Sequence, residues 1–425
     1  MDIFACGAFG VFFVCVCVLE IVFERKNKNN NMSSIINNEV INNNNNMKQE
    51  TTTTKRVPVG ILGGTGLVGR MLARHLTTHP YFSCGPIIGS SRSVGILFEE
   101  IWKGKEEDLT NHYGNELWVA DSDFPEALKG VEVSSLDDLL ASDCRYVISA
   151  IAPRFGFLED KLIEHGINVI SISPYKRQEN CLTVLEANHE DLKKSLLEKR
   201  KALQEVKSGI VPGIMVKSPN CVCCGTTVVL RALSDAFKGL GDVSVTTMQS
   251  LSGRGDAKYP ADLVVGNVYP LGGVTEHTEA LIGEELKAVL GNRIGNVSVK
   301  AYRVSVQRGH LIDVRVKTGC AVNDVDEVYS ALEKFHPLQN YSLPTVPKIP
   351  LECIRDGGCP RPKSHHPGLD NKGLKISVGN IKVNDGVYDI TLSLVVDNLA
   401  KGAFAAALQL LEFYHHIEQE EDEKK

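Results

Sequence analysis

Residues 57–69 have the sequence Val-Pro-Val-Gly-Ile-Leu-Gly-Gly-Thr-Gly-Leu-Val-Gly, and this stretch decides the fold class. Its first six residues predict a strand, and the pattern from Leu67 to Thr77 predicts a helix. Gly63, Gly66 and Gly69 lie in and just after the turn between them. Glycines at this spacing let backbone N–H groups approach a pyrophosphate at the helix N-terminus. The stretch therefore predicts a Rossmann nucleotide-binding domain, with a plain tight turn as the alternative.

Short β-branched runs alternate with helical stretches after this turn. Strands separated by helices indicate a parallel sheet with crossover connections. The further strands predicted for this sheet are 86–90, 146–150 and 168–173.

The pattern changes after residue 217. Long alternating strands, which are typical of antiparallel sheets, are predicted at 243–251, 297–306, 312–317, 376–383 and 387–396. A loop is predicted at 343–368, and a final amphipathic helix at 400–416. The expected fold is α/β: a Rossmann domain over 55–217, then an α+β domain over 218–397 with a mixed, largely antiparallel sheet.

A cysteine follows a Pro-Asn turn in residues 218–227, Ser-Pro-Asn-Cys-Val-Cys-Cys-Gly-Thr-Thr. The apolar run 228–233 predicts a helix, so Cys221 would lie at a helix N-terminus, where the macrodipole favours a thiolate. A thiolate attacks aldehydes and acyl groups. His310, far downstream, has a side chain that titrates near neutrality. With the nucleotide turn, the two residues predict covalent redox chemistry at an acyl carbon, although each alone is more often structural.

The segment after the second predicted strand indicates which cofactor is preferred. Residues 89–95 have the sequence Gly-Ser-Ser-Arg-Ser-Val-Gly. An acidic residue at this place would suit the ribose diol of NAD, whereas hydroxyls and a guanidinium suit a 2′-phosphate. The sequence therefore favours NADP, with a polar loop and one solvated arginine as the alternative.

Composition excludes two other classes of protein. A formal net charge of -6 and the lack of a basic stripe with interleaved aromatics argue against nucleic-acid binding. The 12 cysteines lack the repeated CxxC pairs of a zinc site, so no metal is expected. Unpaired thiols in a chain of this length indicate a reducing compartment.

The first 54 residues lie outside the predicted fold. Residues 3–23 are almost wholly apolar and just long enough to span a bilayer, with basic residues after them that would keep the folded part cytosolic. The alternative is that translation starts at Met32 or Met47. An Asn-rich tract at 27–46 and Thr51–Thr54 have the composition of disorder. We expect a cytoplasmic protein, with membrane contact only if residues 3–23 are a real anchor.

With these motifs in place, the chain from Val57 to Glu412 resembles the aspartate-semialdehyde dehydrogenases, closest to the fungal and archaeal branch. The resemblance rests on an ordered set of motifs: the glycine turn, Ser-Ser-Arg-Ser-Val-Gly at 90–95, Ser-Pro-Asn-Cys at 218–221, Gln-Ser-Leu-Ser-Gly at 249–253, Arg303 with His310, and Asp-Asn-Leu-Ala-Lys-Gly-Ala at 397–403. Many oxidoreductases share the glycine turn alone. The resemblance to this one family therefore depends on the whole set of motifs occurring in this order.

The resemblance implies a role for each matching residue. Cys221 would be the nucleophile and His310 the general base, with Asn220 and Gln249 placing the substrate and Arg303 binding its carboxylate. The helix 398–417 would pack back on the nucleotide domain. The cofactor-binding residues implied are Gly63, Gly64, Thr65, Gly66, Leu67, Val68, Gly69, Ser90, Ser91, Arg92, Ser93, Ser252, Gly253 and Asn398.

The chain departs from the family pattern in three places. The family commonly has an asparagine in the segment matching 171–177, and this chain does not, although Arg177 falls where a phosphate-binding arginine is expected. Small residues usually follow the nucleophile, whereas Val222, Cys223 and Cys224 stand here. The acidic residue for the substrate amine maps to either Glu276 or Glu279.

The resemblance implies NADPH-dependent reduction of L-aspartyl 4-phosphate to L-aspartate 4-semialdehyde through a cysteine thioester, a step in lysine, threonine, methionine and isoleucine biosynthesis. The implied partners are this small substrate, phosphate, and a second or further copies in a homodimer or homotetramer. The protein could instead be a malonyl- or succinyl-CoA reductase or an N-acetylglutamyl-phosphate reductase, since these enzymes use the same thioester chemistry on another acyl donor. A non-catalytic NADP-binding sensor is a further alternative.

Overall fold

The glycine turn joins β1 (Val57–Leu62) to α2 (Leu67–Thr77), and both elements have the predicted bounds. Gly63 has a φ of 85°, in the region that favours glycine. A Cβ added to Gly69 would lie 2.3 Å from the Gly63 carbonyl oxygen, so the first turn of the helix packs directly on the loop. The turn therefore requires glycine at both positions.

The computed structural model describes residues 56–103, 123–205, 209–253, 264, 266–273, 277–355, 357–365 and 374–423. The predicted N-terminal extension, 1–54, lies outside them. In the described part of the chain no helix is both long and apolar enough to cross a bilayer. The candidate span at residues 3–23 lies outside the described residues.

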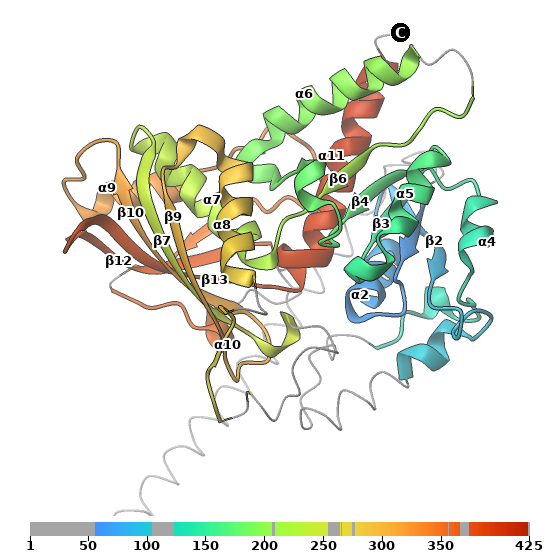
Figure 1. Ribbon diagram of the computed structural model, residues 1–425, viewed down its shortest axis with the longest axis horizontal. Coiled ribbons are helices and arrows are strands. Elements are labelled where there is room, and N and C mark those ends of the chain that lie inside the picture. Colours follow the sequence, from blue (N-terminus) through green and yellow to red (C-terminus); the bar gives the residue numbers. More distant parts are fainter. Residues whose placement is uncertain are drawn as a thin grey trace, which may run out of the picture. The chain divides into compact units, whose positions relative to one another are not determined.

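The first sheet has six strands in the order β2-β1-β3-β4-β6-β5, and all neighbours pair in parallel (Figure 1). Its remaining strands are β2 (Phe82–Ile88), β3 (Tyr146–Ser149), β4 (Asn168–Ser171), β5 (Cys181–Leu182) and β6 (Met215–Lys217). The described helices α4 (Leu136–Leu140), α5 (Phe157–Glu164) and α6 (Leu185–Gln204) connect them. Because the strand order reverses beside β1, a crevice for a nucleotide is expected between the ends of β1 and β3.

The second sheet has seven strands in the order β11-β12-β13-β10-β7-β9-β8. They are β7 (Leu240–Gln249), β8 (Tyr269–Pro270), β9 (Val297–Arg303), β10 (His310–Thr318), β11 (Leu351–Cys353), β12 (Ile376–Asp385) and β13 (Tyr388–Val396). β7 with β9 and β11 with β12 are parallel pairs, and the other neighbours are antiparallel. The predicted α/β fold with a mixed, largely antiparallel second sheet is confirmed.

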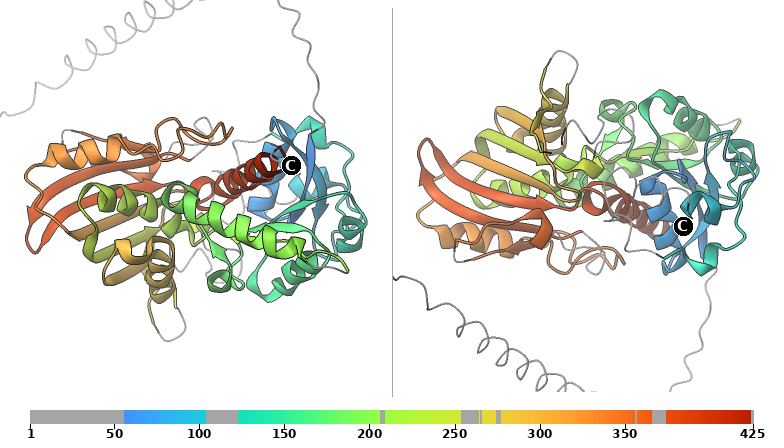
Figure 2. Two further views of the ribbon diagram at one scale, coloured as in Figure 1. Left: turned by 90° about the horizontal axis from the view of Figure 1, so that it is seen from above. Right: turned by 90° about the horizontal axis from the view of Figure 1, so that it is seen from below.

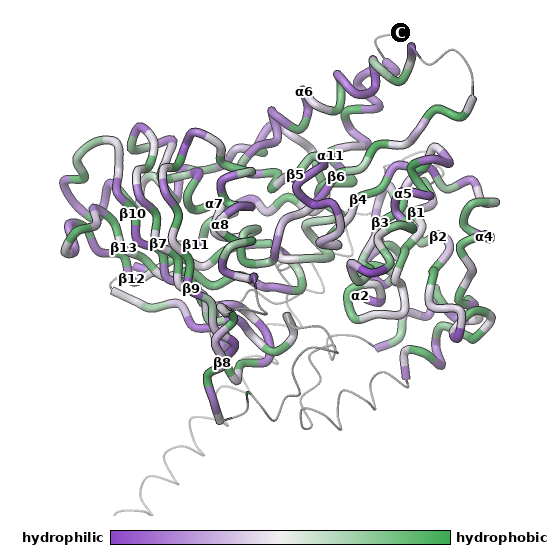
Figure 3. Tube along the Cα trace, in the orientation of Figure 1, coloured by the Kyte–Doolittle hydropathy of each residue, from purple (hydrophilic) through white to green (hydrophobic). Residues whose placement is uncertain are grey.

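Three helices share one hydrophobic cluster with this sheet: α7 (Cys221–Ala236), α8 (Thr278–Leu290) and α9 (Val325–Glu333). Figure 3 shows hydrophobic residues recurring along the strands of both sheets, while α6 is largely hydrophilic. The loop predicted at 343–368 also holds β11 and the short helix α10 (Pro362–His365).

The chain ends in a π-helical turn, η7 (Ala400–Phe404), followed by α11 (Ala405–Asp422). The carboxylate of Asp397 accepts the backbone N–H groups of Leu399 and Ala400, at 3.0 and 3.1 Å, and so satisfies the start of η7. Apolar residues of α11 belong to the same hydrophobic cluster as β1 and α2. In both views of Figure 2 this helix lies beside the first sheet.

Candidate active site

Cys221 is the first residue of α7, as predicted for a thiol at a helix N-terminus. Asn220 caps the helix, because its side-chain oxygen accepts the N–H of Val222 at 2.9 Å. The Cys221 sulfur lies 3.1 Å from Nε2 of His310 and the residue is half-buried. The structure thus brings together two residues that are 89 positions apart.

A backbone hydrogen bond to His310 determines which ring nitrogen carries the proton when the ring is neutral. The backbone N–H of Ser250 donates to Nδ1 of His310 at 3.0 Å. A backbone nitrogen always carries its hydrogen, so Nδ1 accepts and the proton of the neutral ring is on Nε2, facing the Cys221 sulfur. Burial and the nearby charge of Arg303 lower the pKa of His310 to about 3. In this arrangement the ring presents a neutral N–H donor to the sulfur, and its role as general base stays a prediction.

The environment of the thiol differs from the one predicted for a helix N-terminus. Burial raises the pKa of Cys221 above its ordinary value. The charges of Arg303 and Arg177 and the N–H of Val222 oppose this rise, and the charge of Glu285 adds to it. Since desolvation is the largest effect, the pKa stays raised in spite of these positive neighbours, and the helix terminus does not by itself make this cysteine a thiolate.

Arg303 ends β9 beside the histidine. In the register of the parallel pair it stands opposite Gln249, the last residue of β7, and both are buried. One guanidinium N–H of Arg303 donates to the carbonyl of Ser250 at 2.8 Å. A Cβ added to Gly253 would lie 2.9 Å from Cε1 of His310 and 3.2 Å from Nη1 of Arg303, so glycine there lets the 249–253 segment close over both side chains.

Arg177 and Glu285 form a buried ion pair at the start of α7. Nη1 of Arg177 is 2.8 Å from a carboxylate oxygen of Glu285, and Nη2 donates to the carbonyl of Ile172 at 2.7 Å. The second carboxylate oxygen of Glu285 accepts the backbone N–H of Asn220. Nε of Arg177 is buried and has no partner among the described residues. An anion beside Cys221 would satisfy that nitrogen.

The sequence did not identify Glu285. A carboxylate on the buried face of α8, between Ile282 and Leu286, was the available signal, since charged residues are rarely buried without a partner. Glu279, one of the two predicted acidic residues, accepts the N–H of Ala301 at 3.0 Å and pairs with Lys300. Its described contacts are therefore with β9, and its role toward the substrate amine stays a prediction. Glu276 lies outside the described residues.

The predicted nucleotide residues gather at the start of α2. Gly66 is the N-cap of α2 and makes no side-chain capping bond, so the first N–H groups of the helix are available to a phosphate. A Cβ on Gly89 would lie 2.8 Å from Thr65 and 2.5 Å from Ser93, which places the segment 89–93 against the glycine turn. Ser90, Ser91 and Arg92 are exposed, and Ser93 is buried and donates to the carbonyl of Ser90.

Two predicted cofactor residues, Ser252 and Asn398, have their side chains engaged around His310. The Asn398 carbonyl oxygen accepts the N–H of Gly309 at 2.9 Å and the hydroxyl of Ser250 at 3.0 Å, and its amide donates to Ser252 at 2.9 Å. The neighbouring residues Arg308 and Asp397 form a buried bidentate ion pair. Residues 308–310 and 397–398 therefore hold each other in place, a support that the sequence did not reveal.

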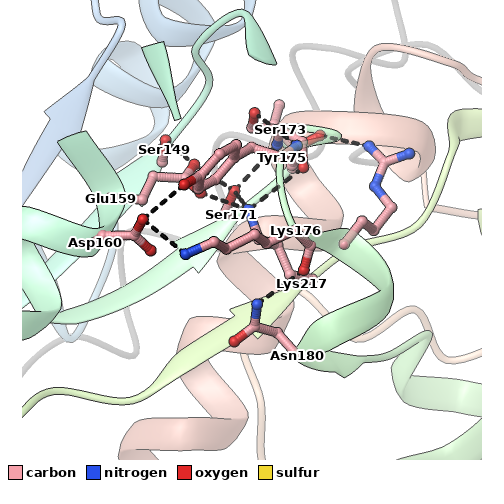
Figure 4. Close-up of polar contacts among 11 residues, drawn as sticks. Ser149, Glu159, Asp160, Ser171, Ser173, Tyr175, Lys176, Asn180 and Lys217 are labelled. Atoms are coloured by element: carbon pink, nitrogen blue, oxygen red, sulfur yellow. Dashed lines mark hydrogen bonds and ion pairs between the residues drawn. The ribbon is translucent and has the colours of Figure 1, made fainter. Parts of the chain in front are cut away.

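A second buried network fixes the carboxyl ends of the parallel strands (Figure 4). Lys217 and Glu159 form an ion pair with no exposed side-chain surface. Glu159 also accepts the hydroxyls of Ser149 and Ser171, each at 2.6 Å. These contacts join β3, β4 and β6, and β6 leads into the turn that ends at Cys221. The network therefore anchors the nucleophile to the nucleotide-binding sheet.

The structure joins a Rossmann sheet to a mixed sheet and sets a cysteine at the start of α7 against a histidine at the start of β10, as the resemblance to semialdehyde dehydrogenases implies. In agreement, residues 58–195 match the model of the semialdehyde dehydrogenase NAD binding domain and residues 230–401 match that of the semialdehyde dehydrogenase dimerisation domain.

The relatives narrow the class further. An aspartate-semialdehyde dehydrogenase of Archaeoglobus fulgidus is 30% identical over 83% of this chain and 96% of its own. The crystal structure of aspartate semialdehyde dehydrogenase with NADP from Candida albicans superimposes with a TM-score of 0.72 at 22% identity, over 85% of this chain and 99% of that one. A malonyl CoA reductase (NADP) of Metallosphaera sedula is 26% identical over 82% of this chain and 94% of its own. The chain belongs to the aspartate-semialdehyde dehydrogenase family.

Proposed function

We propose that the protein reduces L-aspartyl 4-phosphate to L-aspartate 4-semialdehyde with NADPH, a step toward lysine, threonine, methionine and isoleucine. The observation that carries the proposal is the 3.1 Å contact between the Cys221 sulfur and Nε2 of His310 at a helix N-terminus. The proposed substrate rests on membership of the family, and the proposed cysteine chemistry rests on this contact.

The residues present fit NADP. The uncapped start of α2 suits a pyrophosphate, and the exposed guanidinium of Arg92, flanked by serine hydroxyls, suits a 2′-phosphate. When bound, the cofactor supplies the hydride. The chain's own groups supply the nucleophile, the proton and the charges that hold the substrate.

The Cys221 sulfur attacks the acyl carbon, the carbon–oxygen bond to phosphate breaks, and the thiol proton leaves with the phosphate as hydrogen phosphate, so that a thioester is left on the sulfur. Once hydride has been added to that carbon, the oxyanion would expel the Cys221 sulfur as a thiolate and release the aldehyde, and a proton from solvent would restore the thiol. The Nε2–H of His310 donates to the sulfur before the attack and to the oxyanion as it forms, and backbone N–H groups at the start of α7 add to this stabilisation.

Charged groups around the thiol match the two ends of the substrate. Arg303 would bind the carboxylate through its planar guanidinium. The unpartnered Nε of Arg177 would bind the phosphate oxygens. Glu285 is a third candidate for the substrate amine beside Glu276 and Glu279, because its carboxylate contacts the turn that carries Cys221.

The test compares Cys221→Ser with Cys223→Ser in an assay that follows NADPH oxidation. Cys221→Ser should lose activity by about 10⁴-fold or more, as is usual when a covalent nucleophile is removed. Cys223→Ser should keep most of it, since its sulfur faces the carbonyl of Ile282 in α8. Near-normal turnover of the Cys221 variant would remove the proposed mechanism.

A malonyl-CoA reductase is the second candidate, because one relative carries that name at 26% identity. A CoA thioester has no amine at the reacting end, so Glu285 would have no partner in it. Parallel assays with aspartate semialdehyde plus phosphate and with malonyl-CoA distinguish the two activities.

We also propose a homodimer or homotetramer formed through the second sheet, which the match to the dimerisation domain model supports. Residues 55–217 with the helix 398–417 would form the nucleotide domain and 218–397 the catalytic domain, since α11 shares the hydrophobic cluster of β1. Light scattering on the purified protein tests the oligomer, and a monomer would contradict it.

A further inference from the structure

Cys224 lies three residues after Cys221 in the first turn of α7, and the reaction proposed above does not use it. Residues three apart in an α-helix lie on one face, with Cα atoms about 5 Å apart by helix geometry. Disulfides join Cα atoms roughly 4.4–6.8 Å apart. The backbone therefore already holds the two cysteines at a separation that a disulfide requires.

The directions of the side chains agree with this spacing. The Cys224 sulfur lies 3.5 Å from the hydroxyl of Ser218 and 3.6 Å from the carbonyl of Pro219, so it points back to the turn that precedes Cys221. The Cys223 sulfur instead lies 3.6 Å from the carbonyl of Ile282 in α8. Helix residues two apart project about 160° away from each other, so Cys223 cannot reach Cys221.

The two thiols also differ in access. Cys221 is half-buried, whereas Cys224 is fully buried. Cys-X-X-Cys pairs at helix N-termini are the reactive pairs of disulfide oxidoreductases, in which an accessible first cysteine is joined by a second in the same turn. Cys221 and Cys224 have the same arrangement, although Cys221 is here the proposed nucleophile of a different reaction.

We propose that Cys221 and Cys224 form a reversible disulfide when the protein meets hydrogen peroxide. The Cys221 sulfur attacks one peroxide oxygen, the O–O bond breaks, water leaves, and Cys221 is oxidised by two electrons to a sulfenic acid. The Cys224 sulfur then attacks the Cys221 sulfur, the S–O bond breaks, and the Cys224 proton leaves with the hydroxyl as water. A dithiol reductant returns both thiols.

The disulfide would silence the enzyme and protect the nucleophile from irreversible oxidation. The inference rests on the proposed function only for the loss of turnover, because the bond itself is detected by mass. Failure of the proposed function would leave the mass result unchanged, and failure of the inference would leave turnover in reducing buffer unchanged.

The experiment exposes the full-length protein to hydrogen peroxide and maps its peptides by mass spectrometry without reduction. Within the peptide that carries both residues, we expect a loss of two hydrogen masses and disappearance of both thiols from alkylation. Activity should fall with the same time course and return with dithiothreitol. Cys223→Ser is the matched control and should behave in the same way.

In Cys224→Ser, and in Cys224→Ala as a second variant with different packing, the crosslink should be absent. Cys221 should instead advance to sulfinic acid, and dithiothreitol should no longer restore activity. A crosslink from Cys221 to Cys223, or reversible inactivation that survives in both Cys224 variants, would overturn the proposal.

Discussion

The backbone N–H of Ser250 donates to Nδ1 of His310, with 3.0 Å between the two nitrogens. This bond leaves only Nε2 to carry the proton of the neutral ring, and Nε2 is the atom that faces Cys221. The histidine is thereby prepared as a hydrogen-bond donor to sulfur.

The first prediction concerns the pH dependence of stability. The native pKa of His310 is lowered to about 3, whereas an unfolded histidine titrates near 6.5. Between these values the unfolded chain binds the additional proton, so stability should fall as pH drops from about 6.5 toward 3. Urea unfolding at several pH values in this range gives the free energy of unfolding. This free energy should fall less steeply with falling pH in His310→Gln than in the parent. An identical pH dependence in the two proteins would contradict the buried neutral ring.

The second prediction concerns Arg303. A lysine keeps the charge but cannot reproduce both a planar grip on a carboxylate and the bond to the Ser250 carbonyl. We expect Arg303→Lys to lower kcat/KM by roughly 100-fold, with most of the loss arising from misplaced substrate. Lys300→Arg, on the exposed side of the same strand, serves as the control and should leave kcat/KM unchanged.

The third prediction concerns cofactor choice. Arg92 is exposed and can meet a 2′-phosphate without breaking a contact inside the protein. Removing a charge-assisted bond of this kind costs about 1.5–3 kcal/mol, so Arg92→Ala should weaken NADPH binding by about 10-fold to 100-fold and leave NADH binding unchanged. Fluorescence titration with both nucleotides measures the ratio, and equal losses would assign the arginine a structural role.

The fourth prediction concerns the buried pair in Figure 4. Lys217→Met leaves the carboxylate of Glu159 buried without its cation, so the free energy of unfolding should fall by about 3–5 kcal/mol. Combining it with Glu159→Gln should restore part of the loss. Lys129→Ala, which breaks an exposed pair with Glu126, should have no measurable effect.

The sequence was sufficient to predict the elements whose pattern lies within a short stretch of chain. The bounds of β1 and α2 follow from a short apolar run, glycines at fixed spacing and a helical pattern, and all of these lie within 57–77. The start of α7 at Cys221 was predicted from the Pro-Asn turn before it and the apolar run after it, although Cys223, Cys224 and Gly225 between them are weak helix formers.

The site could be predicted only in part, for a similar reason. Motifs named Cys221, Arg303 and His310, and the structure brings the three together. The partners that support them are set by pairings across long stretches of chain, such as Arg177 with Glu285 and Arg308 with Asp397. No local pattern predicts such pairs, so the sequence identified neither Glu285 nor its ion pair with Arg177.

Gly402 has a consequence for which residues the chain tolerates beside its nucleophile. A Cβ at this position would lie 2.5 Å from that of Cys221, so η7 closes directly upon the start of α7. Even an alanine at 402 would force these two segments apart, and a substitution that adds a single carbon there would displace the sulfur from its place against the histidine ring.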